Sequence, residues 1–309
     1  MNRCPLNLAR WGGAWIVAWA VCQPPAWASP EPEVPADSVR FLSEFSGTGR
    51  LLFFANHQDE LQEDRFLTEG AMALDFTFIS FAEKLSLRSR FTLLANMGTS
   101  VAENLPFSPK ETAYEITPFV EYRTAAHLVR FGWNHVCQHL IYKDNETPWY
   151  VAAGSNNVPP DVYYNRLFLG AGRREIRPEI LRQVFFGRRE GGPVPPRVIW
   201  YVEAGGYLRS LPGMDEESLA GGNAWTADLT ADLRLLLHAA DRWLLFANSR
   251  TQVLLDGDDE WYSRERVELE VAFNPRGFGL SLLLGAHLLD EHPRDSKEGL
   301  IELGAVSYF

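Results

Sequence analysis

Long apolar runs are almost absent from this sequence. The most extended one, over residues 11–22, falls short of the ~20 consecutive apolar residues that a membrane-spanning helix needs. The mean hydropathy of the whole chain is −0.18. Together these values exclude a helical membrane protein with several spans.

Basic residues and nucleotide-binding motifs are also scarce. The chain carries 29 Lys and Arg against 40 Asp and Glu, a formal net charge of −11, so nucleic acid is not an expected partner. The sequence contains no glycine-rich phosphate loop, no paired-cysteine zinc motif and no dinucleotide-binding fingerprint. Nothing in it therefore indicates a nucleotide cofactor.

The first residues have the features of a secretory signal peptide, expected over 1–28. Arg3 and Arg10 precede the apolar run, and the small residues Ala26 and Ala28 provide the site that a signal peptidase recognises. A membrane anchor is the alternative. The signal peptide predicts export from the cytoplasm.

Removal of this leader would leave a single thiol. Cys4 and Cys22 lie within it, so Cys137 is the only cysteine of the mature chain and no intramolecular disulfide can form. The segment after the leader starts rich in proline and acid. We expect residues 29–48 to form a periplasmic linker.

Aromatic residues are abundant, and many segments alternate between apolar and polar residues. The aromatic share is 13%, with ten Trp and ten Tyr, which suits a protein with aromatic girdles at two membrane interfaces. In 227–237 the odd positions are all Ala or Leu, whereas Asp, Thr and Arg occupy even ones. A strand separates these two sets onto two faces, while a helix would mix them. The same alternation recurs in 85–97, 198–208, 267–273, 278–288 and 301–309.

These segments predict an all-β protein, an antiparallel transmembrane β-barrel of about twelve strands in the bacterial outer membrane. We expect the barrel over 49–309. The terminal Phe309 resembles the C-terminal signal by which barrel-assembly machinery recognises its clients. A soluble β-sandwich is the alternative. The expected strands are roughly 49–57, 67–82, 85–98, 113–123, 127–139, 161–171, 197–209, 224–238, 242–256, 261–274, 278–289 and 298–309.

The connections between these strands alternate between tight and long, as in bacterial barrels with short periplasmic turns. The connection over 172–196 is the exception, because it is long where a tight turn is expected. Within it, residues 178–186 could form a short amphipathic helix at the membrane surface.

One strand carries polar side chains on its apolar face. Period 2 places His135, Cys137 and His139 on the face that looks toward lipid, and on the next strand Asn165 shares that face while Arg166 points inward. Polar groups that face lipid are costly, which favours a functional role. A nucleophile two residues from a base, with an amide to orient the imidazole, is the set that acyl transfer needs.

At these two strands the sequence resembles the outer-membrane phospholipase A family, twelve-stranded barrels with a lipid-facing Ser-His-Asn site. The family carries Gly-Tyr-Asn-His-x-Ser followed by Ser-Trp-Asn-Arg, and residues 132–137 and 163–166 match these stretches in order. The resemblance implies that His135 is the general base, Cys137 the nucleophile and Asn165 the group that holds the imidazole.

The match departs from the family at the nucleophile. Cys137 stands where the family has serine, and Gln138 and His139 replace the glycine and asparagine that follow it. A thiolate is the better nucleophile, so thioester chemistry is expected more readily than hydrolysis of an ordinary ester. A less studied set of outer-membrane barrels carries His-x-Ser-x-His, which His135, Cys137 and His139 also resemble.

The phospholipase family uses calcium at a dimer interface, supplied partly by the loop after the nucleophile strand. Asp144 and Glu146 lie in the equivalent loop here. The resemblance therefore implies these two residues as calcium ligands and a homodimer as the assembly.

Each site residue also has a structural explanation. Cys137 could be a small apolar side chain on a lipid-facing strand, and the two histidines could be interfacial residues near the headgroups. Asn165 could cap a strand end. The three residues His135, Cys137 and His139 could instead bind zinc, although the sequence offers no obvious fourth ligand.

Two functions follow from the sequence. The first is an outer-membrane lipid acyl hydrolase or acyltransferase of phospholipase type, acting on outer-leaflet phospholipid or lipopolysaccharide through an acyl-enzyme on Cys137. The second is a non-catalytic barrel, a structural or small-solute protein that keeps the scaffold alone. Charge pairing across the lumen would argue against an open pore. The charges expected to point inward are Arg88, Arg90, Arg234, Arg264, Arg266, Asp232, Glu268 and Glu270.

Overall fold

The computed structural model describes residues 38–82, 84–100, 105–140, 161–173, 197–208, 225–240, 243–257, 259–273, 279–292 and 296–308. Several expectations fall outside this part of the chain. They are the signal peptide over 1–28, the proposed calcium ligands Asp144 and Glu146, the amphipathic helix over 178–186, and the terminal Phe309.

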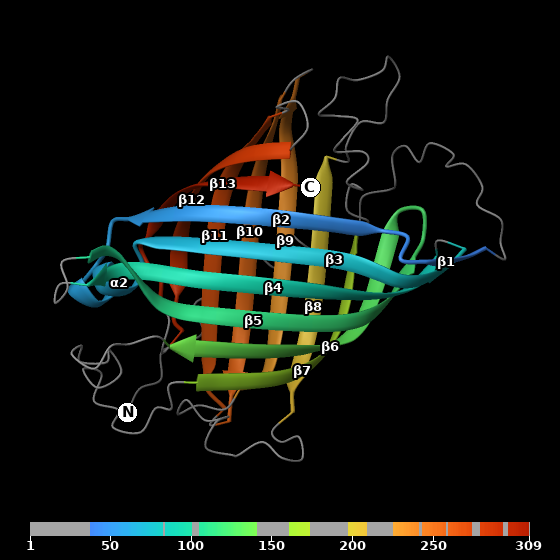
Figure 1. Cartoon of the computed structure of the whole chain (residues 1–309), viewed down its shortest axis with the longest axis horizontal. Coiled ribbons are helices and arrows are strands. Elements are labelled where there is room, and N and C mark those ends of the chain that lie inside the picture. Colours follow the sequence, from blue (N-terminus) through green and yellow to red (C-terminus); the bar gives the residue numbers. More distant parts are fainter. Residues whose placement is uncertain are drawn as a thin grey trace, which may run out of the picture.

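Within these residues, twelve long strands form one closed antiparallel sheet (Figure 1). Strands adjacent in the chain pair with each other, and the last strand pairs with the first long one, which closes the barrel. This confirms the predicted fold class. The strands are β2 (Phe45–Ala55), β3 (Thr68–Phe81), β4 (Leu85–Ser100), β5 (Leu105–Arg123), β6 (His127–Leu140), β7 (Asp161–Arg173), β8 (Val198–Tyr207), β9 (Trp225–Ala239), β10 (Trp243–Asp256), β11 (Trp261–Phe273), β12 (Gly279–Asp290) and β13 (Ile301–Tyr308).

A short strand, β1 (Val39–Phe41), extends the sheet beyond the start of β2. β1 pairs with Ile79–Phe81, the last residues of β3. β2 pairs with the earlier part of the same strand, Thr68–Phe76. Leu42, with a φ of 47°, makes the break between β1 and β2. Strand structure therefore begins inside the segment 29–48 that we expect to be a linker, because its proline-rich part ends before Val39.

β5 begins at Leu105 rather than at the expected residue 113. Proline cannot donate a ladder hydrogen bond, so Pro109 is unusual within a strand. The structure places Pro109 at a register shift: it lies opposite Met97, while Glu111 lies opposite Asn96. The extra residue forms a β-bulge, which tolerates proline and interrupts the alternation that the sequence pattern relies on.

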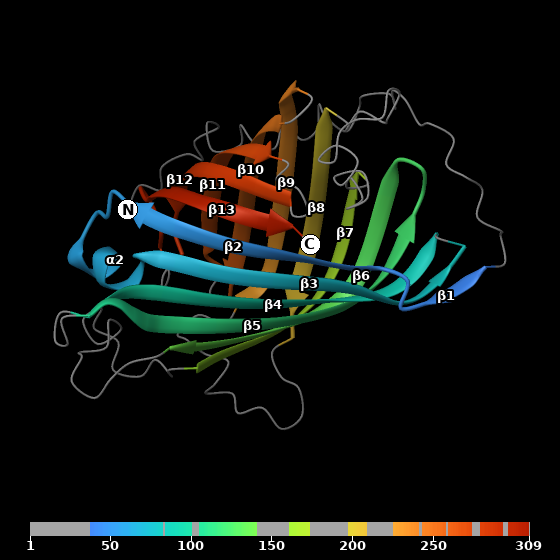
Figure 2. The same ribbon diagram turned by 45° about the horizontal axis from the view of Figure 1, so that its top comes forward.

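The outer wall of the barrel is apolar. Outward side chains such as Phe131, Leu169 and Leu303 are among the most exposed large apolar residues. Strands β2 to β5 of the near wall cross strands β8 to β11 of the far wall (Figures 1 and 2), as expected for tilted barrel strands. The alternation read from the sequence thus corresponds to an outer apolar face and an inner polar one.

The lumen contains paired charges. Glu69 is buried and contacts Arg50 and Lys297, the latter with Nζ 2.6 Å from its Oε2. The inward charges predicted from the sequence lie in ion pairs, which join Arg88 to Glu44, Arg90 to Asp75, Arg234 to Glu270, Arg250 to Asp232, Arg264 to Asp290, and Arg266 to Glu268 and Glu302.

Two connections pack together at the end of the barrel opposite the tight turns. The helix α2 (Glu60–Arg65) follows β2, and the Asp59 side chain caps it by accepting a hydrogen bond from the Gln62 backbone at 2.8 Å. The Gln62 side chain donates to the backbone carbonyl of Glu298, in the β12–β13 connection, at 3.1 Å. In bacterial barrels this is the external end, because the tight turns are periplasmic.

No helix in the described part of the chain is both long enough and apolar enough to cross a bilayer.

A closed barrel satisfies every strand within the sheet, and its apolar outer wall needs a hydrocarbon environment. The protein is therefore a β-barrel of the bacterial outer membrane.

Candidate functional site

The candidate site lies on the outer wall, on β6 and β7. Phe131 of β6 and Leu167 of β7 are exposed on the outer face. Asn134 and Arg166 point the other way, since Asn134 donates to Thr117 at 3.1 Å and Arg166 pairs with luminal carboxylates. Odd positions of both strands therefore face lipid. This is the facing that the sequence pattern predicts for His135, Cys137, His139 and Asn165.

His135 and Asn165 are direct partners across the β6–β7 pair. The Nδ1 atom of His135 lies 3.1 Å from the Oδ1 atom of Asn165, and the Trp133 ring stacks on the imidazole at a centroid distance of 5.7 Å. Asn165 is only 1% exposed although it faces outward. The imidazole is thus held from two sides. If Nδ1 donates to the amide oxygen, Nε2 is the nitrogen that can accept a proton.

Cys137 contacts the second histidine of the strand. Its Sγ atom lies 2.7 Å from Nε2 of His139, and the Tyr114 ring of β5 meets the His139 ring edge-on at a centroid distance of 6.0 Å. The thiol is partly buried. A nucleophile and a base are therefore in hydrogen-bonding reach on the lipid side of the barrel.

This contact differs from the expected one, in which His135 is the partner of the thiol. His135 and His139 lie on the same face of β6, two residues before and two residues after Cys137. The strand pattern therefore does not indicate which of them contacts the thiol. The neighbouring strand makes the difference, because Asn165 lies opposite His135 and holds its Nδ1. The sequence could reveal this only through the register of β7.

Arg166 lies apart from the outer cluster. Its guanidinium contacts Glu203 at 2.5 Å and Asp228 at 2.8 Å on the luminal side. Gly205 of β8 makes room for this side chain, since a Cβ atom there would overlap the guanidinium. Arg166 therefore fixes β7 to β8 and β9 from inside, behind Asn165.

The metal expectations have no structural counterpart in the part of the chain that is described. Asp144 and Glu146 lie outside it. Among the described residues, no group of three or more His, Cys, Asp or Glu side chains is arranged to hold a metal ion, so the zinc alternative for His135, Cys137 and His139 gains no support.

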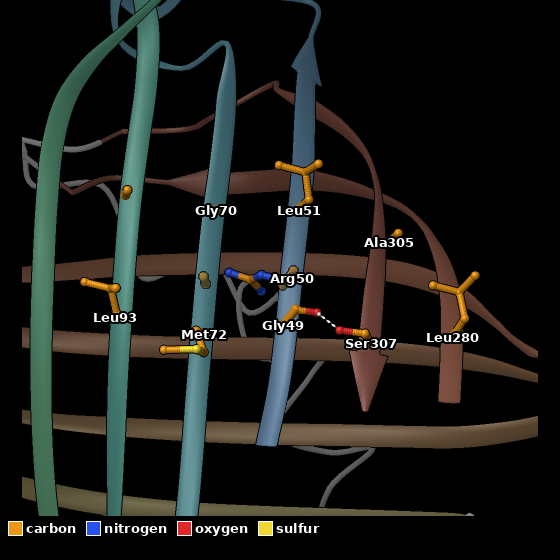
Figure 3. Close-up of a pocket in the computed structure, with 11 residues that line it drawn as sticks. Gly49, Arg50, Leu51, Gly70, Met72, Leu93, Leu280, Ala305 and Ser307 are labelled. Carbon is orange, nitrogen blue, oxygen red and sulfur yellow. Dashed lines mark hydrogen bonds between the residues drawn. The ribbon is translucent and has the colours of Figure 1, made fainter. Parts of the chain in front are cut away.

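A shallow groove of about 500 Å³ opens on the same outer wall (Figure 3). Small residues such as Gly49 and Gly70 form its floor, and a Cβ atom added to Gly70 would meet nothing within 4 Å. Leu51, Met72 and Leu93 stand along it (Figure 3). The sequence pattern did not reveal this groove. The available signal was a glycine or alanine at an outward position on each of several strands, namely Gly49, Gly70, Ala95 and Ala305.

The groove lies on the same cross-strand rows as the reactive side chains. In one row Gly49, Met72, Leu93, Tyr114 and Cys137 are successive partners on β2 to β6. In the adjacent row, Leu51, Gly70, Ala95, Thr112 and His139 follow one another in the same order. Directly paired residues point to the same side of a sheet, so both rows face lipid along their length.

No protein-family model matches this chain, and a search of curated proteins finds no match. Among solved structures it is similar to outer membrane phospholipase A from Escherichia coli, with 12% identity and a TM-score of 0.45, over 86% of this chain and 97% of that one.

Two further solved barrels are similar. An outer membrane channel from Pseudomonas putida F1 has 12% identity and a TM-score of 0.44, over 91% of this chain and 100% of that one. LpxR from Salmonella typhimurium has 9% identity and a TM-score of 0.40, over 85% and 99%. The location of this chain in the outer membrane does not depend on these similarities. It rests on the chain's own closed barrel and apolar outer wall.

Proposed function

We propose that this protein is an outer-membrane lipid acyl hydrolase or acyltransferase that works on the outer wall of its barrel. The observation that carries the proposal is the contact between Cys137 and His139, beside the pair of His135 and Asn165, at positions that face lipid. Apolar side chains would cost less free energy at these lipid-facing positions. A thiol, two imidazoles and an orienting amide are the groups of nucleophilic acyl transfer.

The depth of Cys137 supports a lipid ester as the substrate. β6 is described as far as Leu140 toward the external side, and Cys137 lies about 10 Å along the strand from Leu140. A thiol near the external end of the strand supports a substrate whose ester lies in the outer leaflet, toward the level of the headgroups. We propose outer-leaflet phospholipid or lipopolysaccharide as the acyl donor.

The groove supports the same substrate class. At about 4.8 Å per strand, Leu93 lies about 10 Å from Cys137 along its row and Gly49 about 19 Å. The row continues to Ser307, next to the periplasmic end of β13, so it descends into the membrane as it leaves β6. An acyl chain whose ester meets Cys137 would follow this direction, with its tail in the groove.

The chemistry proposed is attack of the Cys137 sulfur on the acyl carbonyl carbon, which gives a thioester and releases the alcohol part of the lipid. Water then yields a fatty acid, or a second alcohol accepts the acyl group. The resemblance to the outer-membrane phospholipase A family agrees with this reaction class. That resemblance also implies calcium, which is a variable of the assay, and a homodimer, which is part of the proposal.

The test measures fatty-acid release from phospholipid micelles by the purified protein, with and without calcium. Wild type should release fatty acid, Cys137→Ala should release none, and Cys137→Ser reports whether a hydroxyl can replace the thiol. Leu169→Ala, an outward change on β7 away from the cluster, is the matched control. If wild type and both Cys137 variants release no fatty acid in any condition, the proposed hydrolase activity is wrong.

The second candidate is a barrel with a purely structural role. The observation that favours it over a small-solute pore is the pairing of luminal charges, such as Glu69 with Lys297 and Glu302 with Arg266. A structural barrel would show neither lipid hydrolysis nor steady conductance in a planar bilayer. Conductance without hydrolysis would instead indicate a pore.

A further inference from the structure

We propose that the two histidines of β6 divide the proton transfers of the reaction: His139 takes the proton of the Cys137 thiol, and His135 takes the proton of the water that releases the product. This inference rests on the proposed acyl-transfer function and deepens it. It assigns the base for the nucleophile to the residue after Cys137, not to the one before it.

The position of His139 suits the first transfer. Its Nε2 atom lies 2.7 Å from the sulfur, so the imidazole nitrogen is in direct contact with the thiol. The Tyr114 ring of the neighbouring strand packs edge-on against the His139 ring. An imidazole in this position stabilises the thiolate by accepting its proton, which is how a histidine activates a cysteine nucleophile.

The position of His135 suits the second transfer. Its Nδ1 faces the amide oxygen of Asn165 at 3.1 Å, and the amide is almost fully buried. A ring held in this way keeps its proton on Nδ1 and presents Nε2 as an acceptor. Trp133 covers one ring face, so the imidazole has a fixed plane. His135 is therefore prepared to accept a proton from a small molecule such as water.

In the acylation half, the Sγ–H proton moves to Nε2 of His139, and the sulfur attacks the carbonyl carbon of the lipid ester. The tetrahedral adduct collapses with cleavage of the C–O bond. The proton on His139 passes to the leaving oxygen, so the products are an acyl thioester on Cys137 and a neutral alcohol.

In the deacylation half, Nε2 of His135 takes a proton from water as the water oxygen attacks the thioester carbon. Collapse breaks the C–S bond and gives the fatty acid and the Cys137 thiolate. The proton held by His135 then returns to the thiolate, which restores the starting enzyme with no net change in charge or oxidation state.

The first experiment measures alkylation of the refolded full-length chain with iodoacetamide at neutral pH, read by mass spectrometry at the peptide that contains Cys137. His139→Gln should lower the rate about tenfold, because thiolate formation loses its base. His135→Gln should change the rate by less than about twofold. His127→Gln, on the same face of β6 at its other end, is the matched control.

The second experiment follows the thioester after addition of a phospholipid. His135→Gln should accumulate acylated Cys137, because water attack is slowed, whereas His139→Gln should form the thioester slowly and accumulate none. His139→Asn serves as a second variant if His139→Gln does not refold. Heat-dependent migration in gel electrophoresis reports whether each barrel is folded.

The outcomes separate the two proposals. Equal alkylation rates in wild type and His139→Gln, or accumulation of thioester in His139→Gln but not in His135→Gln, would overturn the division of roles while fatty-acid release still supports the function. Slower alkylation of His139→Gln in a protein that releases no fatty acid would overturn the function and retain only the thiol–imidazole pair.

Discussion

The lumen and the outer wall at β6 and β7 hold their polar groups in different ways. Inside, carboxylates are compensated by cations: Glu121 is fully buried among Arg88, Arg123 and Arg130. Outside, the described polar cluster contains a thiol, two imidazoles and an amide. Buried charges inside a barrel need partners of opposite sign, whereas polar groups against lipid stand where apolar side chains would cost less. The luminal charges are accounted for by the fold, whereas the thiol, imidazoles and amide on the outer wall need a functional explanation.

Loss of the nucleophile should separate the two regions most clearly. Cys137→Ala should reduce fatty-acid release by a factor of about 10³ or more, because the covalent step is removed. The free energy of unfolding should change by less than about 1 kcal/mol, since alanine suits a lipid-facing strand. A lipid assay and urea unfolding in bilayers check the two effects. A large loss of stability would mean that Cys137 is a packing residue.

The reverse pattern is expected in the lumen. Glu121→Ala leaves the surrounding arginines without their carboxylate and should lower the free energy of unfolding by about 3–5 kcal/mol. The activity per folded molecule should remain near that of wild type, because Glu121 lies on the other side of the sheet from Cys137. Unfolding in urea and activity normalised to the folded fraction measure both quantities. An unchanged stability would show that the luminal pairs contribute little.

Removal of the orienting amide should have a smaller effect. Asn165→Ala should lower kcat about 10²-fold with little change in KM, since the imidazole of His135 loses its fixed orientation while lipid binding is kept. Asn165→Asp should recover part of the activity, because a carboxylate can also accept from Nδ1. Equal kcat for wild type and Asn165→Ala would show that the contact has no part in the reaction.

The smallest effect is expected from filling the groove. Gly70→Leu places a side chain in open space and should lower activity about tenfold on long acyl chains while leaving short chains unaffected. Gly206→Leu is the matched control, because a Cβ atom at Gly206 also meets nothing within 4 Å and this residue lies on β8, away from both rows. The same loss for short and long chains would remove the groove from the acyl path.

Much of the barrel can be predicted from the alternation of apolar and polar residues alone. The alternation in 227–237 predicts which side chains of β9 face lipid, and it also predicts the inward position of Arg234, which pairs with Glu270. Boundaries are harder to predict where the ladder is irregular. The bulge beside Pro109 hides the first half of β5, and the break at Leu42 hides β1, because in each place the alternation stops while the pairing continues.

The site shows a similar division between local and non-local information. The facing of His135, Cys137, His139 and Asn165 depends on position within a strand, so the sequence predicts it. The choice of His139 as the contact of the thiol depends on what the adjacent strands place opposite each histidine. Register between strands far apart in the sequence cannot be read from either strand alone. The groove depends on the alignment of β2, β3 and β4 for the same reason.

The most direct test of acyl transfer on the outer wall is mass spectrometry of the Cys137 peptide after the protein has been mixed with phospholipid. The account predicts an acyl adduct on Cys137 that hydroxylamine removes, present in wild type, enriched in His135→Gln and absent from Cys137→Ala. An unmodified Cys137 in wild type and His135→Gln, in samples that release no fatty acid, would contradict it.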